Sequence, residues 1–328
     1  MRWIVAAALA VVLAVAAVAG LFTFAVYGDR SRPATRTQVV IDRGATFAQV
    51  GRQLAAAGVI SNVLTFRLLA RLRSQEGAVR AGEYRFGPRV TQSEVLRSLT
   101  SGGAQVATWV TIPEGFTAAE IAARLQDAGV GESSAFLRAF KTERLVVGGS
   151  RTENLEGFLF PSTYLVPLGA SPAQVASLMT GEFFKQIPAD AAARARALHV
   201  SVPQAVTVAS LIEREAKSAA DRPKIAQVIY NRLRFGMPLQ VDATIEYALP
   251  EHKSELSFAD LKIASPYNTY VHAGLPPTPI ANPGEPSLQA AFHPGKSDDL
   301  YYVYCGNGRH VFAKTLAEHQ ANVARCLQ

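Results

Sequence analysis

The sequence predicts an α+β protein preceded by a single membrane-spanning helix. Three features of the 328 residues support this reading: an uncharged apolar run at the N-terminus, a strand–helix pattern that occurs twice in the first half, and amphipathic helices mixed with short strands in the second half. Mixed strands and helices of this kind indicate an α+β fold. Beyond the apolar run, the chain is long enough for two or three domains.

The N-terminal run is expected to anchor the chain in a membrane. No charged residue occurs from Trp3 to Tyr27, and a helix of this length can cross about 30 Å of hydrocarbon. The alternative is a cleaved signal peptide, because small residues near Gly20 could form a cleavage site. The run is longer than the apolar core of about 7–15 residues of such peptides. We therefore predict an uncleaved anchor at 1–28, whose orientation the flanking arginines leave open.

A strand–helix pattern occurs twice after a polar linker at residues 29–37. Each copy consists of a strand, a glycine turn, an N-capping threonine, an amphipathic helix and a glycine that ends the helix. Six positions recur 71 residues apart: Ile41, Gly44, Thr46, Val50, Leu54 and Gly58 match Ile112, Gly115, Thr117, Ile121, Leu125 and Gly129. Between the copies, residues 80–86 alternate as a strand, and Thr91 with Glu94 forms a capping box. We predict two related α+β units near 38–106 and 108–150.

The order strand, helix, helix, strand in this region resembles the LysM-type sugar-binding module. The alternative is a generic α+β spacer that holds the following domain away from the bilayer. Both readings stay open, and no residue between 38 and 150 is assigned to sugar binding.

The second half, residues 151–328, is predicted to be a mixed α+β catalytic domain. Helices are expected at 171–186, at 190–198, beyond Pro203 and from Asp221 to Leu233. From Gly236 onwards the chain is rich in proline, and stiff loops of this kind suit the wall of a preformed cleft. Strands at 300–304 and 310–312 and a last helix complete the domain.

Glu215 is the candidate catalytic residue of this domain. At about 100° per residue it shares the apolar face of its helix with Leu211 and Ile212, whereas Glu213 points nearly the opposite way, into solvent. A carboxyl group on a buried face loses solvation, so its pKa rises and it can act as a general acid near neutral pH. A structural ion pair, for example with Arg232, would explain a half-buried glutamate equally well.

Charge and composition limit the partners and cofactors. The net charge of +7 suits an acidic partner such as nucleic acid, anionic lipid or an anionic wall polymer. No nucleic-acid-binding motif or dense basic run is present, so no nucleic-acid partner is expected. The six histidines lack ligand-like spacing, and neither a metal nor another cofactor is predicted. Cys305 and Cys326 could form a disulfide in an exported chain or remain free thiols.

Several short sequence blocks in the second half occur in a recognisable order. They are Ala209–Glu215 (ASLIERE), Tyr230–Leu233 (YNRL), Leu239–Thr244 (LQVDAT), Ser265–Tyr270 (SPYNTY), Gly274–Pro277 (GLPP) and Ile280–Gly284 (IANPG), together with Glu156–Pro161 (EGFLFP) and His310–Phe312 (HVF). In order and spacing they closely resemble the endolytic murein transglycosylases of the YceG-like family. The resemblance covers essentially the whole chain, from the anchor to the last helix.

This resemblance implies a single-pass protein of the inner (plasma) membrane, with its LysM-like region and catalytic domain in the periplasm or outside the cell. The family cuts the MurNAc–GlcNAc β-1,4 bond within nascent peptidoglycan strands, leaves 1,6-anhydroMurNAc ends and limits strand elongation. Its catalytic glutamate corresponds to Glu215. Peptidoglycan strands are the implied partner, with penicillin-binding proteins as candidate synthase partners. The family commonly has Asp where this chain has Ser162, so no acidic role is expected there.

The matched blocks also supply candidates for binding the hydroxyl and amide groups of the sugar. They are Gln240, Asp242, Thr244, Tyr267, Asn268 and Glu156. Structural alternatives exist for several: Asn268 could cap a turn, Tyr267 could belong to the core and Asp242 could cap a helix. Two other functions stay open: a lysozyme-type hydrolase with Asp242, Glu246 or Glu156 as second carboxylate, and a non-catalytic wall-binding scaffold.

Overall fold

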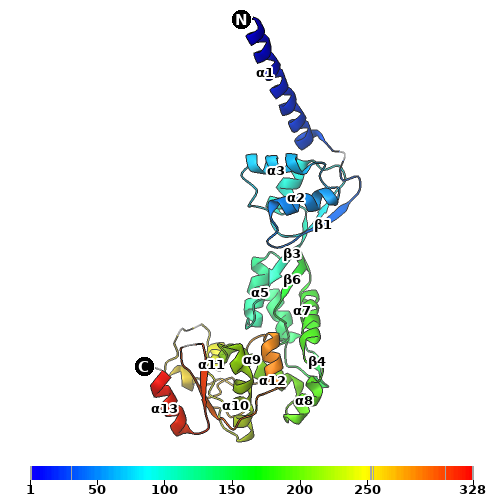
Figure 1. The fold of residues 1–328 in the computed structure, drawn as a ribbon. Helices are drawn as coiled ribbons and strands as arrows, with labels where there is room; N and C mark the ends of the chain where they lie inside the picture. Colours follow the sequence, from blue (N-terminus) through cyan, green and yellow to red (C-terminus); the bar gives the residue numbers. More distant parts are fainter. Residues whose placement is uncertain (1, 31, 252, 254, 307, 327–328) are drawn as a thin grey trace. The chain divides into compact units, whose positions relative to one another are not determined.

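The computed structural model describes residues 2–30, 32–251, 253, 255–306 and 308–326, and it is an α+β structure as predicted (Figure 1). The chain forms two compact units. The first comprises residues 1–110 and 164–169, and the second comprises residues 111–163 and 170–328. The boundary between the two units therefore lies near residue 110. The domain boundaries predicted from the sequence, including the one near residue 150, stay predictions.

The N-terminal helix is one continuous apolar element. α1 (Arg2–Thr23) continues into a π-helical turn, η1 (Phe24–Gly28), and an 18-residue stretch of this helix has a mean hydropathy of 2.8. No residue of α1 is buried, whereas Val26 in η1 packs into the core of the first unit. By length and composition, this helix can cross a membrane.

The first unit is built on a four-stranded sheet with the strand order β1-β2-β3-β6. The strands are β1 (Thr37–Ile41), β2 (Gly82–Phe86), β3 (Gln105–Thr111) and β6 (Thr163–Pro167), and the helices are α2 (Phe47–Ala56), α3 (Val63–Leu72) and α4 (Gln92–Ser101). β2 pairs antiparallel with both β1 and β3. Tyr84 and Phe86 of β2 are buried with Phe66 of α3 and Leu96 of α4, so the helices and the sheet share one apolar core.

Both predicted strand–helix segments have the expected local structure. Thr46 and Thr117 each form a capping box at the start of α2 and α5 (Ala118–Asp127). Gly44 and Gly115 precede them with φ of 77° and 78°, a region that favours glycine. The predicted capping box at Thr91 is also present. β3 belongs to the sheet of the first unit, whereas α5 lies in the second unit. A LysM relationship and a common origin of the two segments stay predictions.

The second unit is mainly helical. Its helices are α5, α6 (Ser133–Thr142), α7 (Pro172–Gln186), α8 (Ala191–Ala197), α9 (Val202–Glu215), α10 (Arg222–Arg234), α11 (Asp242–Ala248), α12 (Glu285–Phe292) and α13 (Leu316–Cys326), with 3₁₀ turns at Ala219–Asp221 and Asp260–Lys262. Two short hairpins complete it: β4 (Val146–Val147) with β5 (Ser150–Arg151), and β7 (Tyr301–Tyr304) with β8 (His310–Ala313). The core of this unit lies around α9, against which α10 and α12 pack.

α9 is enclosed on every side. It begins at Ser201, whose side chain forms a capping box with Gln204, and every residue from Ala205 to Ile212 is buried. A helical segment that is buried on every side has no solvent-exposed face. The backbone becomes extended at Ala216, so Glu215 is the last helical residue. Its carboxyl group therefore lies where the buried helix ends and where the helix dipole disfavours a negative charge.

Candidate active site

A cavity of about 740 Å³ lies at the end of α9 around Glu215. Its lining comes from the loop after β3, the end of α9, α10, α11, α13 and the β7–β8 hairpin. Its polar lining residues include Glu114, Glu213, Arg214, Glu215, Arg232, Gln240, Asp242, Glu246, Tyr270, Tyr302 and His310. Charged groups and hydroxyls predominate in this wall, so the cavity suits a polar ligand.

Glu215 has the environment of a group that can both give and take a proton. Burial raises the pKa of this half-buried carboxyl group to about 7. A hydrogen bond from the hydroxyl group of Tyr302 to Oε2, 3.0 Å long, lowers the pKa, and the charge of Asp242 raises it. Both protonation states are therefore populated near neutral pH, which is what acid–base catalysis requires.

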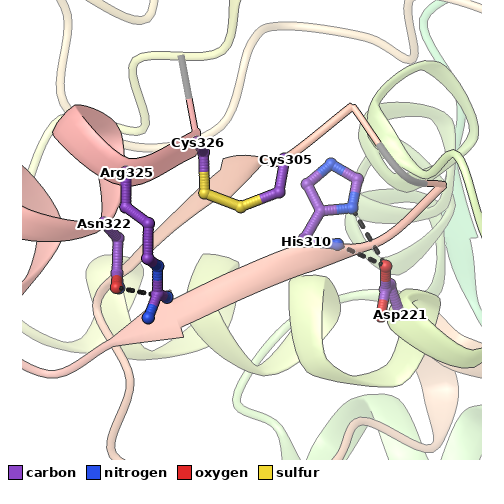
Figure 2. The surroundings of a disulfide bond; sticks show 6 residues. All are labelled: Asp221, Cys305, His310, Asn322, Arg325 and Cys326. Carbon is purple, nitrogen blue, oxygen red and sulfur yellow. Dashed lines mark hydrogen bonds and ion pairs between the residues drawn. A yellow bond between two sulfur atoms is a disulfide. The ribbon is translucent and has the colours of Figure 1, made fainter. Parts of the chain in front are cut away.

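The β7–β8 hairpin positions Tyr302 and His310 at the cavity. The backbone N–H and Nδ1 of His310 lie 2.8 and 3.1 Å from Oδ2 of Asp221 (Figure 2). The ring of Tyr302 packs edge-on against His310, with ring centroids 5.7 Å apart. The two cysteines, whose state the sequence left open, form a disulfide that joins the hairpin at Cys305 to Cys326 of α13 (Figure 2).

Gln240 and Asp242 lie in the same cavity as Glu215. Asp242 is the first residue of α11, where Val241 is the capping position, and its exposed carboxylate accepts a hydrogen bond from the hydroxyl group of Tyr270. Gln240 has a left-handed backbone with φ of 54°, a conformation that costs about 1–3 kcal/mol for residues other than glycine and is concentrated at functional sites. Arg232 donates to Oε1 of Gln240 at 3.4 Å.

Thr244 and Asn268, which the sequence placed at the substrate, are fully buried and do not reach this cavity. The hydroxyl group of Thr244 donates to the carbonyl of Val241 at 2.7 Å and lies 3.0 Å from the hydroxyl group of Thr269. The amide of Asn268 donates to two loop carbonyls and accepts from the backbone N–H of Tyr270. In this structure their polar groups hold together the loop that carries Tyr270, and their substrate-binding role stays a prediction.

Glu156 and Tyr267 lie at a second cavity, of about 850 Å³, and not at the one around Glu215. Glu156 is only 4% exposed, and burial raises its pKa to about 7. Its carboxylate accepts hydrogen bonds from the backbone of Ala118, the amide of Asn282 and the hydroxyl group of Tyr247. Through these hydrogen bonds Glu156 ties the start of α5 to neighbouring loops, and its predicted role in sugar binding stays a prediction.

The position of Glu213 on the helix had predicted that its side chain is exposed to solvent. This prediction is wrong, because α9 is enclosed by neighbouring elements. The side chain of Glu213 is only 7% exposed and lies 3.7 Å from the guanidinium of Arg222, and it accepts a hydrogen bond from the backbone N–H of Gly284. Arg232 is not the ion-pair partner considered for Glu215, since its guanidinium donates to the carbonyls of Leu239 and Leu300.

Tyr270, Tyr302, His310 and Glu114 line the same cavity as Glu215, but they were not among the candidates from the sequence. Tyr270 and His310 lie within matched blocks, whereas Tyr302 and Glu114 carry no local pattern that marks them. Burial and the charge of Glu213 raise the pKa of Glu114. A carboxyl group with a raised pKa in a polar cavity, flanked by further carboxyl and hydroxyl groups, is the kind of site that acid–base catalysis requires.

Comparison with known proteins identifies the kind of enzyme. Residues 39–325 match the YceG-like family, and the chain belongs to this family. It is 34% identical over 306 residues to the endolytic murein transglycosylase of Bacillus subtilis. The aligned region covers 87% of this chain and 83% of that protein. Its identity to the endolytic murein transglycosylase of Streptococcus pneumoniae D39 is 29%, over 87% of this chain and 57% of that one.

A solved structure agrees with this assignment. The crystal structure of a YceG-like protein from Listeria monocytogenes superimposes with a TM-score of 0.63 at 32% identity, and it covers 88% of this chain and 99% of that chain. The resemblance deduced from the sequence blocks is therefore confirmed.

Proposed function

We propose that this protein is an endolytic murein transglycosylase in which Glu215 acts first as acid and then as base. The observation that carries this proposal is the carboxyl group of Glu215, whose pKa is raised to about 7 in a polar cavity. The names of the relatives in Bacillus and Streptococcus support the same activity and the same substrate, peptidoglycan.

The proposed reaction needs no water. Protonated Glu215 gives its proton to the oxygen that bridges MurNAc and GlcNAc, and the bond from that oxygen to C1 of MurNAc breaks. The carboxylate then takes the proton of the C6 hydroxyl group of the same MurNAc, and O6 forms a bond to C1. The products are a free GlcNAc hydroxyl and a 1,6-anhydro end. Because the nucleophile belongs to the same ring, its effective concentration is high.

The neighbours of Glu215 suit this chemistry. Tyr302 occupies Oε2 of the glutamate, which leaves Oε1 for the sugar. The carboxylate of Asp242 supplies negative charge in the cavity where the oxocarbenium-like centre develops. The side-chain amide of Gln240 offers hydrogen bonds for a hydroxyl or acetamido group of the sugar.

The apolar helix suits an anchor that keeps the enzyme close to newly made strands. We expect a single membrane crossing within residues 1–28, with residues 29–328 outside the cytoplasm. Protease added to intact spheroplasts tests this orientation, because the second unit is then digested. Protection of the second unit until the membrane is opened would contradict it.

Product analysis tests the reaction. The full-length protein in detergent is incubated with purified sacculi, and the released muropeptides are analysed by mass spectrometry. A lytic transglycosylase yields anhydro ends, which are lighter than reducing ends by one water. Glu215→Gln is expected to abolish release with its fold intact, and Glu285→Gln, at an exposed position at the start of α12, serves as the matched control.

Two other outcomes would point to other functions. Reducing ends would indicate a hydrolase, and the presence of Asp242 and Glu246 in the same cavity keeps this the second candidate. Equal amounts of soluble product with and without the protein would indicate a non-catalytic scaffold.

A further inference from the structure

We propose that the second cavity, lined by Tyr247 and Tyr267, is an accessory subsite that binds saccharide units of the strand away from the bond that is cut. This inference rests on the proposed function and adds to it a place for a further part of the same substrate. The cavity has a volume of about 850 Å³, and that around Glu215 has about 740 Å³. Both volumes lie within the range of about 300–1,000 Å³ typical of ligand sites.

The two cavities meet at one ion pair. Arg214 and Glu246 line both of them, together with Ala243. The guanidinium of Arg214 lies 3.1 Å from the carboxylate of Glu246, and their side chains are 33% and 28% exposed. This ion pair is thus a partly exposed rim between the two cavities. A polymer that passes over it occupies both, and a strand that is cut internally must extend on each side of the cut.

The second cavity offers aromatic surface to a ligand. The rings of Tyr247 and Tyr267 lie 5.0 Å apart. Both hydroxyl groups already have protein partners: Tyr247 donates to Glu156, and the oxygen of Tyr267 lies 2.8 Å from that of Thr278. What these side chains present to a ligand is therefore their ring surface. Aromatic rings provide large apolar contact areas with few side-chain torsions to order, and the C–H faces of pyranose rings match such surfaces.

The charges around this cavity favour an uncharged ligand. Lys141 and Arg144 at the end of α6 lie in the same wall as Glu120 and Glu153. Arg214 is paired with Glu246, so neither sign is in clear excess. A wall of balanced charge does not concentrate an anion. The glycan backbone therefore fits this cavity better than the carboxylate groups of a peptide stem.

A substitution that fills the cavity tests the proposal. Ala119 is an exposed residue near the start of α5 that lines the second cavity, so Ala119→Trp adds bulk there without removing a hydrogen bond. Ala123→Trp is the matched control, since Ala123 is exposed on the same helix and is not among the described residues that line the cavity. kcat and KM of the full-length enzyme are measured on long glycan strands freed of peptides and on the shortest oligosaccharide that is cut.

The expected result is a rise in KM of about tenfold for Ala119→Trp on long strands, equivalent to about 1.4 kcal/mol of lost binding. kcat should change less than twofold, and the shortest oligosaccharide should be cut as by the unmodified enzyme. Ala123→Trp should behave as the unmodified protein. Tyr267→Leu, which removes the ring but keeps an apolar side chain, should raise KM on long strands in the same way and provides a second test if Ala119→Trp does not fold.

Two outcomes would overturn the proposal. An unchanged KM on long strands for folded Ala119→Trp would show that no saccharide binds in this cavity. An effect that occurs only with strands that carry peptides would assign the cavity to the peptide stem. The proposed function fails in a different way, since the unmodified enzyme would then produce no anhydro ends from any strand.

Discussion

The hydrogen bond from Tyr302 to Glu215 should set the pH at which the enzyme works. Its donor is a hydroxyl group 3.0 Å from Oε2, and it favours the ionised carboxylate. Tyr302→Phe removes this donor and keeps the ring that packs against His310 and Phe312. The pKa of Glu215, raised by burial to about 7, should therefore rise further.

The magnitude follows from the strength of such a bond. Hydrogen bonds to charged groups contribute about 1.5–3 kcal/mol, and one pKa unit corresponds to about 1.36 kcal/mol. Glu215 is half-buried, and water can replace part of the lost bond. We therefore expect a rise of about one unit in the pKa of Glu215. The plateau of kcat/KM should also fall by about tenfold, because the carboxyl group loses its fixed orientation.

The pH dependence of kcat/KM tests this reasoning. Cleavage requires protonated Glu215, so the rate falls as the pH rises through its pKa. In Tyr302→Phe this alkaline fall should move upwards by about one pH unit. Tyr301→Phe on the same strand is the control and should leave the fall in place. An alkaline fall at the original pH, or at a lower one, in Tyr302→Phe would refute the assignment of Tyr302 as a group that positions and tunes Glu215.

Three further predictions concern stability and the disulfide. Glu213→Gln should destabilise the protein by about 1–3 kcal/mol, because Arg222 loses its buried partner, and thermal unfolding measures the loss. The pKa of Glu215 lies above its unfolded value of 4.5, so its contribution to stability is present below pH 4.5 and is lost as the pH rises to about 7. Glu215→Gln should therefore weaken the fall in the free energy of unfolding over this pH range. An unchanged pH dependence of unfolding in the variant would contradict this prediction. Cys305→Ser should lower kcat, because the hairpin that carries Tyr302 loses its disulfide to Cys326. A reductant should lower kcat of the unmodified protein but not that of the variant.

Local features of the fold were predictable because they depend on neighbouring residues. The threonines before α2 and α5 cap those helices as the sequence suggested, and Gly44 and Gly115 adopt the left-handed backbone that few other residues accept. Short-range hydrogen bonds and steric limits govern these features, and both can be read within a few positions. The apolar N-terminal helix was predictable for the same reason.

The site was predictable only where a sequence block carried its chemistry. The blocks gave Glu215, Gln240 and Asp242, which line one cavity. They also gave Thr244 and Asn268, since a motif does not reveal whether a polar residue serves the substrate or the loop that surrounds it. A block of polar residues shows which groups lie close together in the sequence, but it does not show which way each side chain points.

The sequence by itself determined the apolar N-terminal helix, the α+β class, the family and the candidate catalytic glutamate. Only the tertiary structure decided that Glu213 is buried beside Arg222, that Tyr302 reaches Glu215 across 87 positions of sequence, and that a second cavity adjoins the first. The physical reason is that helix periodicity defines directions around one axis, whereas burial and partners depend on what packs against every side of that helix.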